Sequence, residues 1–213
     1  MKKKSTESSQ TSVAIPAPNF KTAIYKITGT APLVMNKFSQ KVREKMRADQ
    51  EAGSQRKKGG KREGKDFQAC FEGAIHRSRE GWIGIPAAAF RAAMVSACRL
   101  IGFKMTIAKL AIFIEADGFD EDDGTPLIRL NAGKPKILEM PVRNETGVVD
   151  IRVRPQWNEW GCELRVKYDA DMFDPESLTN LLMRAGIQVG ICEGRPDSKK
   201  SCGMGWGTFE FAK

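Results

Sequence analysis

The chain has 213 residues, of which 41% are apolar and 29% charged, a balance typical of one elaborated, water-exposed domain. No run approaches the roughly 18 to 20 uninterrupted apolar residues of a membrane span, and no apolar segment follows the basic start. We therefore expect a cytoplasmic protein that is neither secreted nor anchored. Five cysteines without a CxxC pair and a single histidine argue against a disulfide framework, a zinc site and a histidine-activated nucleophile.

The net charge of +9 is concentrated in the first third of the chain. Residues 1–66 hold sixteen Lys or Arg against six Asp or Glu, a balance of +10, so residues 67–213 sum to −1. This asymmetry favours a polyanionic partner, because clustered Lys and Arg gain free energy by releasing condensed counterions. A membrane surface is the weaker candidate, since almost no large apolar residue follows Met46 in the basic run.

The first predicted element is a strand behind a tail. Residues 1–19 are polar, rich in Ser and Thr, and end in "PAP", which predicts a disordered tail. "FKTAIYKITG" at 20–29 then alternates with the period of a strand. Pro32 in the following "TAPLVMNKF" indicates an extended or turn segment tucked against the core. We place a single domain at 20–213.

A basic insertion is predicted at 36–80. Its start, 39–50, is helix-permissive, whereas 52–65 combines four glycines with many basic residues and is not expected to pack. We interpret it as a flexible loop on a helical stalk, and the alternative is a solvated linker without a role. His76 follows this loop and is expected at the surface.

The rest of the chain alternates helices and strands. The acidic turn "GFDEDDG" lacks the closing Glu of a calcium loop, so no metal site is predicted there. The order strand, helix, strand, strand, helix, strand predicts an α+β fold with a ferredoxin-like or RNA-recognition (RRM) βαββαβ core. The predicted elements are a helix at 87–102, strands at 110–117, 126–130, 148–155 and 162–169, a helix at 174–186 capped by Asp174 and ended by Gly186, and the closing strand "TFEF".

Three features indicate contact with single-stranded nucleic acid. Basic residues recur along the predicted stalk helix, so that several share a face for phosphate contacts. In "DIRVRPQWNEW", two arginines share a strand face and two tryptophans follow, which suits base stacking unless the tryptophans belong to the core. The glycine-rich "GICEGRPDSKKSCGMGWG" lets backbone N–H groups approach a phosphate. The candidate nucleic-acid-binding residues are Asn36, Lys37, Phe38, Lys41, Arg43, Arg47, Arg56, Lys57, Lys58, Lys61, Arg62, Arg152, Arg154, Trp157, Arg195, Lys199, Lys200 and Trp206.

Four segments add to the predicted order of elements: "GTAPLVMNKF", "GIPAAAFRAAM", "AGIQVGICEGRP" and "GMGWGTFEF". With these segments in that order, the chain resembles the RAMP superfamily over about residues 20–212. That superfamily includes the CRISPR backbone subunits that polymerise along guide RNA, and phage-borne relatives are the nearest in kind. The resemblance implies an RRM-type palm, a thumb-like insertion at 36–65 that folds over the strand, and head-to-tail assembly. The chain is short for a full backbone subunit and lacks the paired aromatic signature of RRM sheets, so DNA and RNA both stay open.

We therefore expect a non-enzymatic phage protein without a cofactor. It coats single-stranded nucleic acid, chiefly DNA during replication or recombination, as a cooperative helical homo-oligomer. The alternatives are a guide-RNA-binding CRISPR backbone-like subunit, a CRISPR inhibitor that mimics one, a metal-dependent nuclease, and a structural virion protein. A nuclease has only Asp49 and Asp66 near the first strand, and neither lies in a recognisable motif, so no catalytic residue is predicted.

Overall fold

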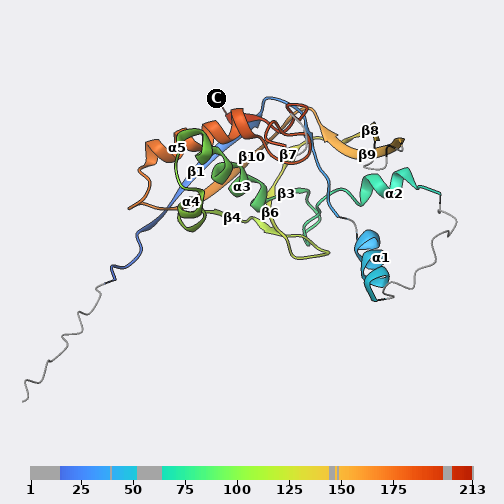
Figure 1. Ribbon diagram of the computed structural model, residues 1–213, viewed down its shortest axis with the longest axis horizontal. Helices are drawn as coiled ribbons and strands as arrows, with labels where there is room; N and C mark the ends of the chain where they lie inside the picture. Colours follow the sequence, from blue (N-terminus) through green and yellow to red (C-terminus); the bar gives the residue numbers. More distant parts are fainter. Residues whose placement is uncertain are drawn as a thin grey trace, which may run out of the picture.

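The structure is a computed structural model that describes residues 15–38, 40–51, 64–143, 147, 149–198 and 203–212. The fold is α+β, and its described strands form three antiparallel sheets (Figure 1). The elements are β1 (Phe20–Gly29), β2 (Leu33–Val34), α1 (Gln40–Glu51), α2 (Phe67–Glu72), β3 (Gly84–Pro86), α3 (Ala87–Ala97), the 3-10 turn Cys98–Ile101, α4 (Met105–Ala111), β4 (Ile112–Glu115), β5 (Gly118–Phe119), β6 (Pro126–Arg129), β7 (Asn131–Ala132), β8 (Lys136–Arg143), β9 (Val149–Trp157), β10 (Trp160–Asp169), α5 (Pro175–Arg184), the π-helical turn Ala185–Val189 and β11 (Phe209–Phe211).

The central sheet has the strand order β11-β1-β10-β4, and β7 pairs with the start of β10. β1 and β10 run antiparallel from Phe20 opposite Asp169 to Thr28 opposite Gly161. Alternate residues of β10 are buried, because successive side chains of a strand point to opposite faces of a sheet. The buried set is Trp160, Cys162, Leu164, Val166 and Tyr168.

Helices α3 and α5 pack against each other and contribute to the same core as the central sheet. α3 is rich in alanine, which allows close packing, and it buries Phe90 and Met94 completely. α5 begins as predicted, because Asp174 Oδ1 accepts a hydrogen bond from the Ser177 N–H at 2.8 Å. Within the described chain, no helix is long and apolar enough to cross a membrane.

Two predicted helix boundaries can now be compared with the structure. The helix predicted at 87–102 is found as α3 followed by a 3-10 turn, and Gly102 ends it with a φ of 69°. The prediction that Gly186 ends the second helix is wrong, because the helical turn continues to Val189 and Gly190 ends it at φ 70°. Gly186 is instead a packing position, since a Cβ there would lie 2.2 Å from the carbonyl oxygen of Phe209. α4, which occupies the start of the strand predicted at 110–117, was not foreseen.

The strand predicted at 148–155 is present as β9, but it does not join the central sheet. β9 pairs along its length with β8 and at its end with β2, and this second sheet projects from the body (Figure 1). β6, predicted at 126–130, joins β3 and β5 in a third sheet. Alternation predicts that these segments are strands, but it does not identify their partners. β8, the main partner of β9, was not among the predicted strands, and β2 and β3 lie far from β9 and β6 in the chain.

The basic insertion starts with the predicted helix, which is found as α1 at Gln40–Glu51. α1 makes no extensive contact with another described element and stands apart from the sheets (Figure 1). The chain then re-enters the body through α2, where Asp66 accepts a hydrogen bond from the Ala69 N–H at 2.9 Å. Most of the tail predicted at 1–19 and of the loop predicted at 52–65 lies outside the described residues.

We predict that Gly186→Ala lowers the free energy of unfolding by about 1–3 kcal/mol, because the added methyl group must displace the backbone of β11. Urea unfolding monitored by circular dichroism measures the change. Gly133→Ala is the matched control, since nothing lies within 4 Å of a Cβ at that position. Equal stability of the two variants would show that β11 does not press against this turn.

Candidate nucleic-acid interface

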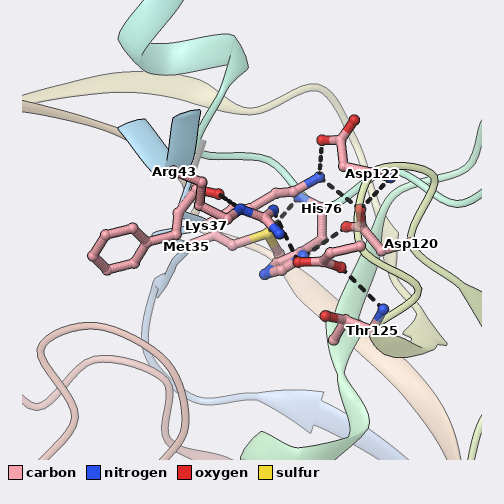
Figure 2. A network of polar contacts seen from close by, with 9 residues as sticks. Met35, Lys37, Arg43, His76, Asp120, Asp122 and Thr125 are labelled. Carbon is pink, nitrogen blue, oxygen red and sulfur yellow. Dashed lines mark hydrogen bonds and ion pairs between the residues drawn. The ribbon is translucent and has the colours of Figure 1, made fainter. Parts of the chain in front are cut away.

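A buried polar network joins three segments that are distant in the sequence (Figure 2). The Lys37 Nζ lies 2.7 Å from Asp120 Oδ1 and 2.5 Å from Asp122 Oδ2. The Nδ1 atom of His76 lies 2.8 Å from the second oxygen of Asp120. The Lys37 side chain is 3% exposed and that of Asp120 is fully buried. Lys37 therefore forms a buried ion pair with Asp120 in the core, and the prediction that Lys37 contacts phosphate is wrong.

The protonation states in the network follow from its geometry. Burial by itself would lower the pKa of Lys37, but hydrogen bonds and charges from Asp120 and Asp122 outweigh it and raise the pKa. Burial would raise the pKa of Asp120, but the hydrogen bonds from Lys37, the Asp122 backbone and His76 lower it instead. Burial is the largest effect at His76 and lowers its pKa, despite the nearby carboxylate. Lys37 and Asp120 are therefore charged at neutral pH, and His76 is neutral.

The prediction that His76 lies at the surface is wrong, because the residue is 8% exposed and hydrogen-bonded. Its partner Asp120 lies 44 residues away in the chain, so no local spacing could reveal the pair. The acidic turn also holds the basic insertion, since Arg43 Nη2 lies 2.9 Å from Asp123 Oδ2. The turn is therefore the electrostatic partner of the start of the insertion. Arg43, with 37% of its side chain exposed, is only partly available to another ligand.

Two of the three features predicted to bind nucleic acid meet at one place. Arg152 and Arg154 share a face of β9 and both approach Glu193 in the glycine-rich loop. The Arg154 Nε lies 2.7 Å from Glu193 Oε2, and the Arg152 Nη1 lies 3.9 Å from Oε1. Arg195 follows in the same loop and donates a hydrogen bond to the carbonyl of Cys192 at 3.1 Å. Two guanidinium groups, those of Arg152 and Arg154, thus lie near the Glu193 carboxylate, and Arg195 is two residues further along the same loop. We call this set, Arg152, Arg154, Glu193 and Arg195, the arginine cluster.

Trp157 and Trp206 were both predicted to contact nucleic acid, but only Trp206 is accessible to solvent. Trp157 is 2% exposed and donates its indole N–H to the Gly133 carbonyl at 3.1 Å. It also lies on the opposite face of β9 from Arg154, so its prediction as a stacking residue is wrong and the alternative, a core residue, is confirmed. Trp160 is likewise in the core, at 4% exposed. Trp206 is partly exposed and packs against Gly194 beside the arginine cluster.

The described part of the glycine-rich loop, residues 190–198 and 203–207, is tightly packed. Its glycines all have positive φ, and a Cβ at Gly203 or Gly207 would lie about 2 Å from a carbonyl oxygen of the same loop. The N–H groups of Glu193 and Gly207 donate to the carbonyls of Val34 and Pro32. Gly203 and Gly207 therefore allow the loop to pack closely against itself, while two backbone hydrogen bonds attach it to β2 and to Pro32.

A cleft of about 940 Å³ opens between α3, α4 and the first part of the glycine-rich loop. Its wall on α3 is formed by Ala88, Ala89 and Ala92, whose small side chains leave the space open. Asn36, Glu193 and Arg195 also line it, so the cleft is continuous with the arginine cluster.

The other candidates are more scattered. Phe38 is 60% exposed, and Arg47 is highly exposed but paired with Glu51 one turn along α1. No pattern in the sequence indicates Glu193 or the role of the acidic turn, because only the fold brings these carboxylates to the basic residues. Outside the described residues or side chains lie Lys41, Arg56, Lys57, Lys58, Lys61, Arg62, Lys199 and Lys200.

Comparison with family models and with curated proteins does not assign the chain to a family. No protein-family model matches the chain, and no curated protein matches it.

We predict that Lys37→Met lowers the free energy of unfolding by about 3–5 kcal/mol, because it leaves the fully buried Asp120 without its cation. Asp122→Asn is the control, since that side chain is 31% exposed and its loss should cost about 1 kcal/mol or less. Urea unfolding of both variants tests the difference. Equal losses would mean that Lys37 is solvated.

We further predict that stability falls as the pH is lowered from 7.5 to 4. A lowered pKa means that stabilisation is present above the unfolded value and is lost as the pH falls toward the folded value. For His76 the loss begins near the unfolded value of 6.5 and lies in this range, whereas for Asp120 it begins only below the unfolded value of 3.8. The raised pKa of Lys37 adds no change in this range, because its stabilisation persists below 10.5. His76→Asn keeps a donor for Asp120 but cannot titrate, so its urea midpoint should change less between pH 7.5 and 5. The same slope in both proteins would contradict the assignment of His76.

Proposed function

We propose that this protein binds single-stranded nucleic acid, without strong sequence preference, through the arginine cluster and the basic insertion. The proposal rests chiefly on the convergence of Arg152, Arg154 and Arg195 beside Trp206, from a projecting hairpin and a loop far apart in sequence. Guanidinium groups bind phosphates bidentately and stack on bases, and a partly exposed indole adds a stacking surface.

The charge distribution supports the same reading. The excess positive charge of the chain lies in residues 1–66. Helix α1 belongs to that region and stands apart from the sheets, with the Arg47 side chain 81% exposed (Figure 1). A mobile phosphate backbone is the polyanion that such a surface fits. Binding as a cooperative oligomer along the strand is part of the proposal, and we propose no catalytic activity.

The arrangement of the central sheet supports a more specific proposal for the fold. The order β11-β1-β10-β4, with all neighbours antiparallel and with α3 and α5 in the connections, is the one expected of a ferredoxin-like βαββαβ core. We propose that this core is a palm of the RAMP type, with α1 and the β8–β9 hairpin as its projecting parts. Within that proposal, single-stranded DNA is the favoured ligand, and guide RNA is the alternative.

The test is a fluorescence-anisotropy titration of nuclease-treated protein with equal-length single-stranded DNA, single-stranded RNA and duplex DNA at several salt concentrations. We predict that the triple variant Arg152→Ala, Arg154→Ala, Arg195→Ala binds single strands at least tenfold more weakly, and that each lost phosphate contact reduces the slope of log K against log salt by about 0.7. Glu193→Gln should bind more tightly, because a carboxylate no longer competes with phosphate.

The matched control is Arg79→Ala, Arg129→Ala, Arg184→Ala, which removes the same charge from exposed positions elsewhere. A second variant, with Ala at Arg56, Lys57, Lys58, Lys61 and Arg62, should weaken binding without changing the unfolding midpoint. Equal effects of the two triple variants would show that binding depends on the net charge of the protein and not on the position of the arginine cluster. A marked RNA preference would favour the guide-binding alternative, and absence of binding to all three ligands would overturn the proposal.

A further inference from the structure

His76 and Asp120 form a fixed pair in which one ring nitrogen of the histidine stays unused. The Nδ1 atom lies 2.8 Å from Asp120 Oδ2, and the other oxygen of Asp120 is held by Lys37 and by the Asp122 N–H (Figure 2). An ionised carboxylate only accepts hydrogen bonds, so Nδ1 carries the ring proton and Nε2 is left as an acceptor. Among the described residues, Nε2 has no hydrogen-bond partner.

The unused nitrogen is open to the cleft beside α3. The side chain of His76 is 11% exposed and the whole residue 8%, so the exposed surface belongs to the side chain. Nε2 is not one of the buried atoms that lack a partner in the described chain, and His76 lines the cleft. Burial lowers the pKa of the ring, which keeps it neutral at neutral pH. One wall of the cleft therefore holds an acceptor of fixed orientation.

The charged side chains of the cleft leave donors for an anion. Four cations and two carboxylates line it: Arg91, Arg99, Lys109, Arg195, Glu193 and Asp197. Both carboxylates are already paired, since Asp197 lies 2.6 Å from Arg99 and Glu193 lies 2.7 Å from Arg154. Within the described chain, the Lys109 Nζ and the Nε and Nη2 of Arg195 have no partner. The cleft is thus positive on balance, and part of that charge is unpaired.

Helix α3 adds an apolar wall of small side chains, Ala88, Ala89 and Ala92. Arg91, on the same helix, fixes this wall relative to β4. Its Nε donates to the Ile112 carbonyl at 2.9 Å, and its guanidinium lies 4.7 Å from the centre of the Phe113 ring. An apolar wall with a few convergent polar groups is the usual composition of a ligand site.

We propose that the cleft binds one nucleoside phosphate, whose base donates a hydrogen bond to His76 Nε2 and whose phosphate contacts the cationic lining. A planar base fits the alanine wall, and the phosphate supplies the anion. Each nucleobase has an N–H donor on its pairing edge, so one acceptor binds any base without selecting among them. Phosphate alone would leave the acceptor and the alanine wall unused, and an uncharged aromatic ligand would leave the cations unused.

This inference rests on the proposed function for the source of the nucleotide, and not for the site itself. Glu193 and Arg195 belong both to the lining of the cleft and to the arginine cluster. A single strand held by the cluster can therefore place one of its nucleotides in the cleft, because the bases of an unpaired strand can be splayed out. A free nucleotide offers the same chemistry and is the second source.

The chain has a single histidine, so selective isotope labelling of histidine gives NMR signals from one imidazole ring. Nuclease-treated protein is titrated with adenosine monophosphate (AMP), with ribose phosphate and with a single-stranded oligonucleotide. In the free protein, Nε2 should show the shift of an unprotonated nitrogen. AMP should move this shift toward the protonated value, because Nε2 then accepts a hydrogen bond. Ribose phosphate has no base and should leave it unchanged.

Variants test the same site by calorimetry with AMP. His76→Asn keeps a donor for Asp120 but ends short of the cleft, so it should weaken AMP binding about three- to tenfold in a protein that stays folded. Ala92→Trp should weaken it about tenfold or more by filling the cleft from an exposed helix position. Asn180→Trp, exposed on α5 and outside the cleft lining, is the matched control and should bind AMP normally.

The outcomes separate this inference from the proposed function. A shift of Nε2 with the oligonucleotide supports a nucleotide of the strand as occupant, and a shift with AMP alone supports a free nucleotide. The inference is overturned if Nε2 carries the ring proton, if neither ligand moves its signal, or if ribose phosphate moves it as AMP does. An oligonucleotide that binds while neither ligand moves the signal leaves the proposed function intact. An oligonucleotide that does not bind, while AMP moves the signal, counts against the proposed function alone.

Discussion

The buried contact between Lys37 and Asp120 is the constraint on which the arrangement of the other segments depends. An unpaired charge in a protein interior costs several kcal/mol, so an ammonium group that is 3% exposed requires its carboxylate partners to be in place. Lys37 precedes α1 and His76 follows α2, and both contact the same aspartate. The Lys37 N–H also donates to the Ala74 carbonyl at 3.0 Å. The basic insertion therefore leaves and re-enters the body at one point.

The short segment between β1 and Lys37 transmits this constraint to the candidate interface. Its carbonyls at Pro32 and Val34 accept hydrogen bonds from the glycine-rich loop, and its Met35 N–H donates to Pro155 of β9. Leu33, Val34 and Met35 are almost completely buried, so the segment is held by core packing as well. One extended stretch thus fixes the loop and the hairpin relative to each other. The position of Arg154 beside Glu193 is a consequence of this arrangement.

Several basic residues at or near the candidate interface are already paired with carboxylates, which the amino-acid composition alone does not show. The acidic turn neutralises Lys37 and part of Arg43, and Glu193 partly neutralises the arginines of β9. A phosphate backbone that binds there replaces a carboxylate that is already present, so its gain is the difference between two ion-pair arrangements. Such competition limits the affinity of any single contact. Binding of a phosphate backbone would then depend on many contacts at once, as in the strand coating that we propose.

Local patterns determined the local structure of this chain. The alternation of β1 and β10 and the Asp174 cap of α5 were readable from the sequence, because each depends on residues a few positions apart. The shared face of Arg152 and Arg154 follows from the period of a strand in the same way. The excess of positive charge in the first third is likewise a property of the sequence alone.

The tertiary structure decided which of these residues are available. Lys37 and Arg47 look alike in the sequence, yet one lies in the core and the other is 81% exposed at its side chain. Trp157 and Trp206 are separated in the same way, and β9 pairs with β8 and not with the central sheet. Burial and ion pairing depend on contacts between distant residues, since Lys37 and His76 lie 83 and 44 positions from Asp120. No local pattern records such contacts, because their free energy exists only once the distant segments have met.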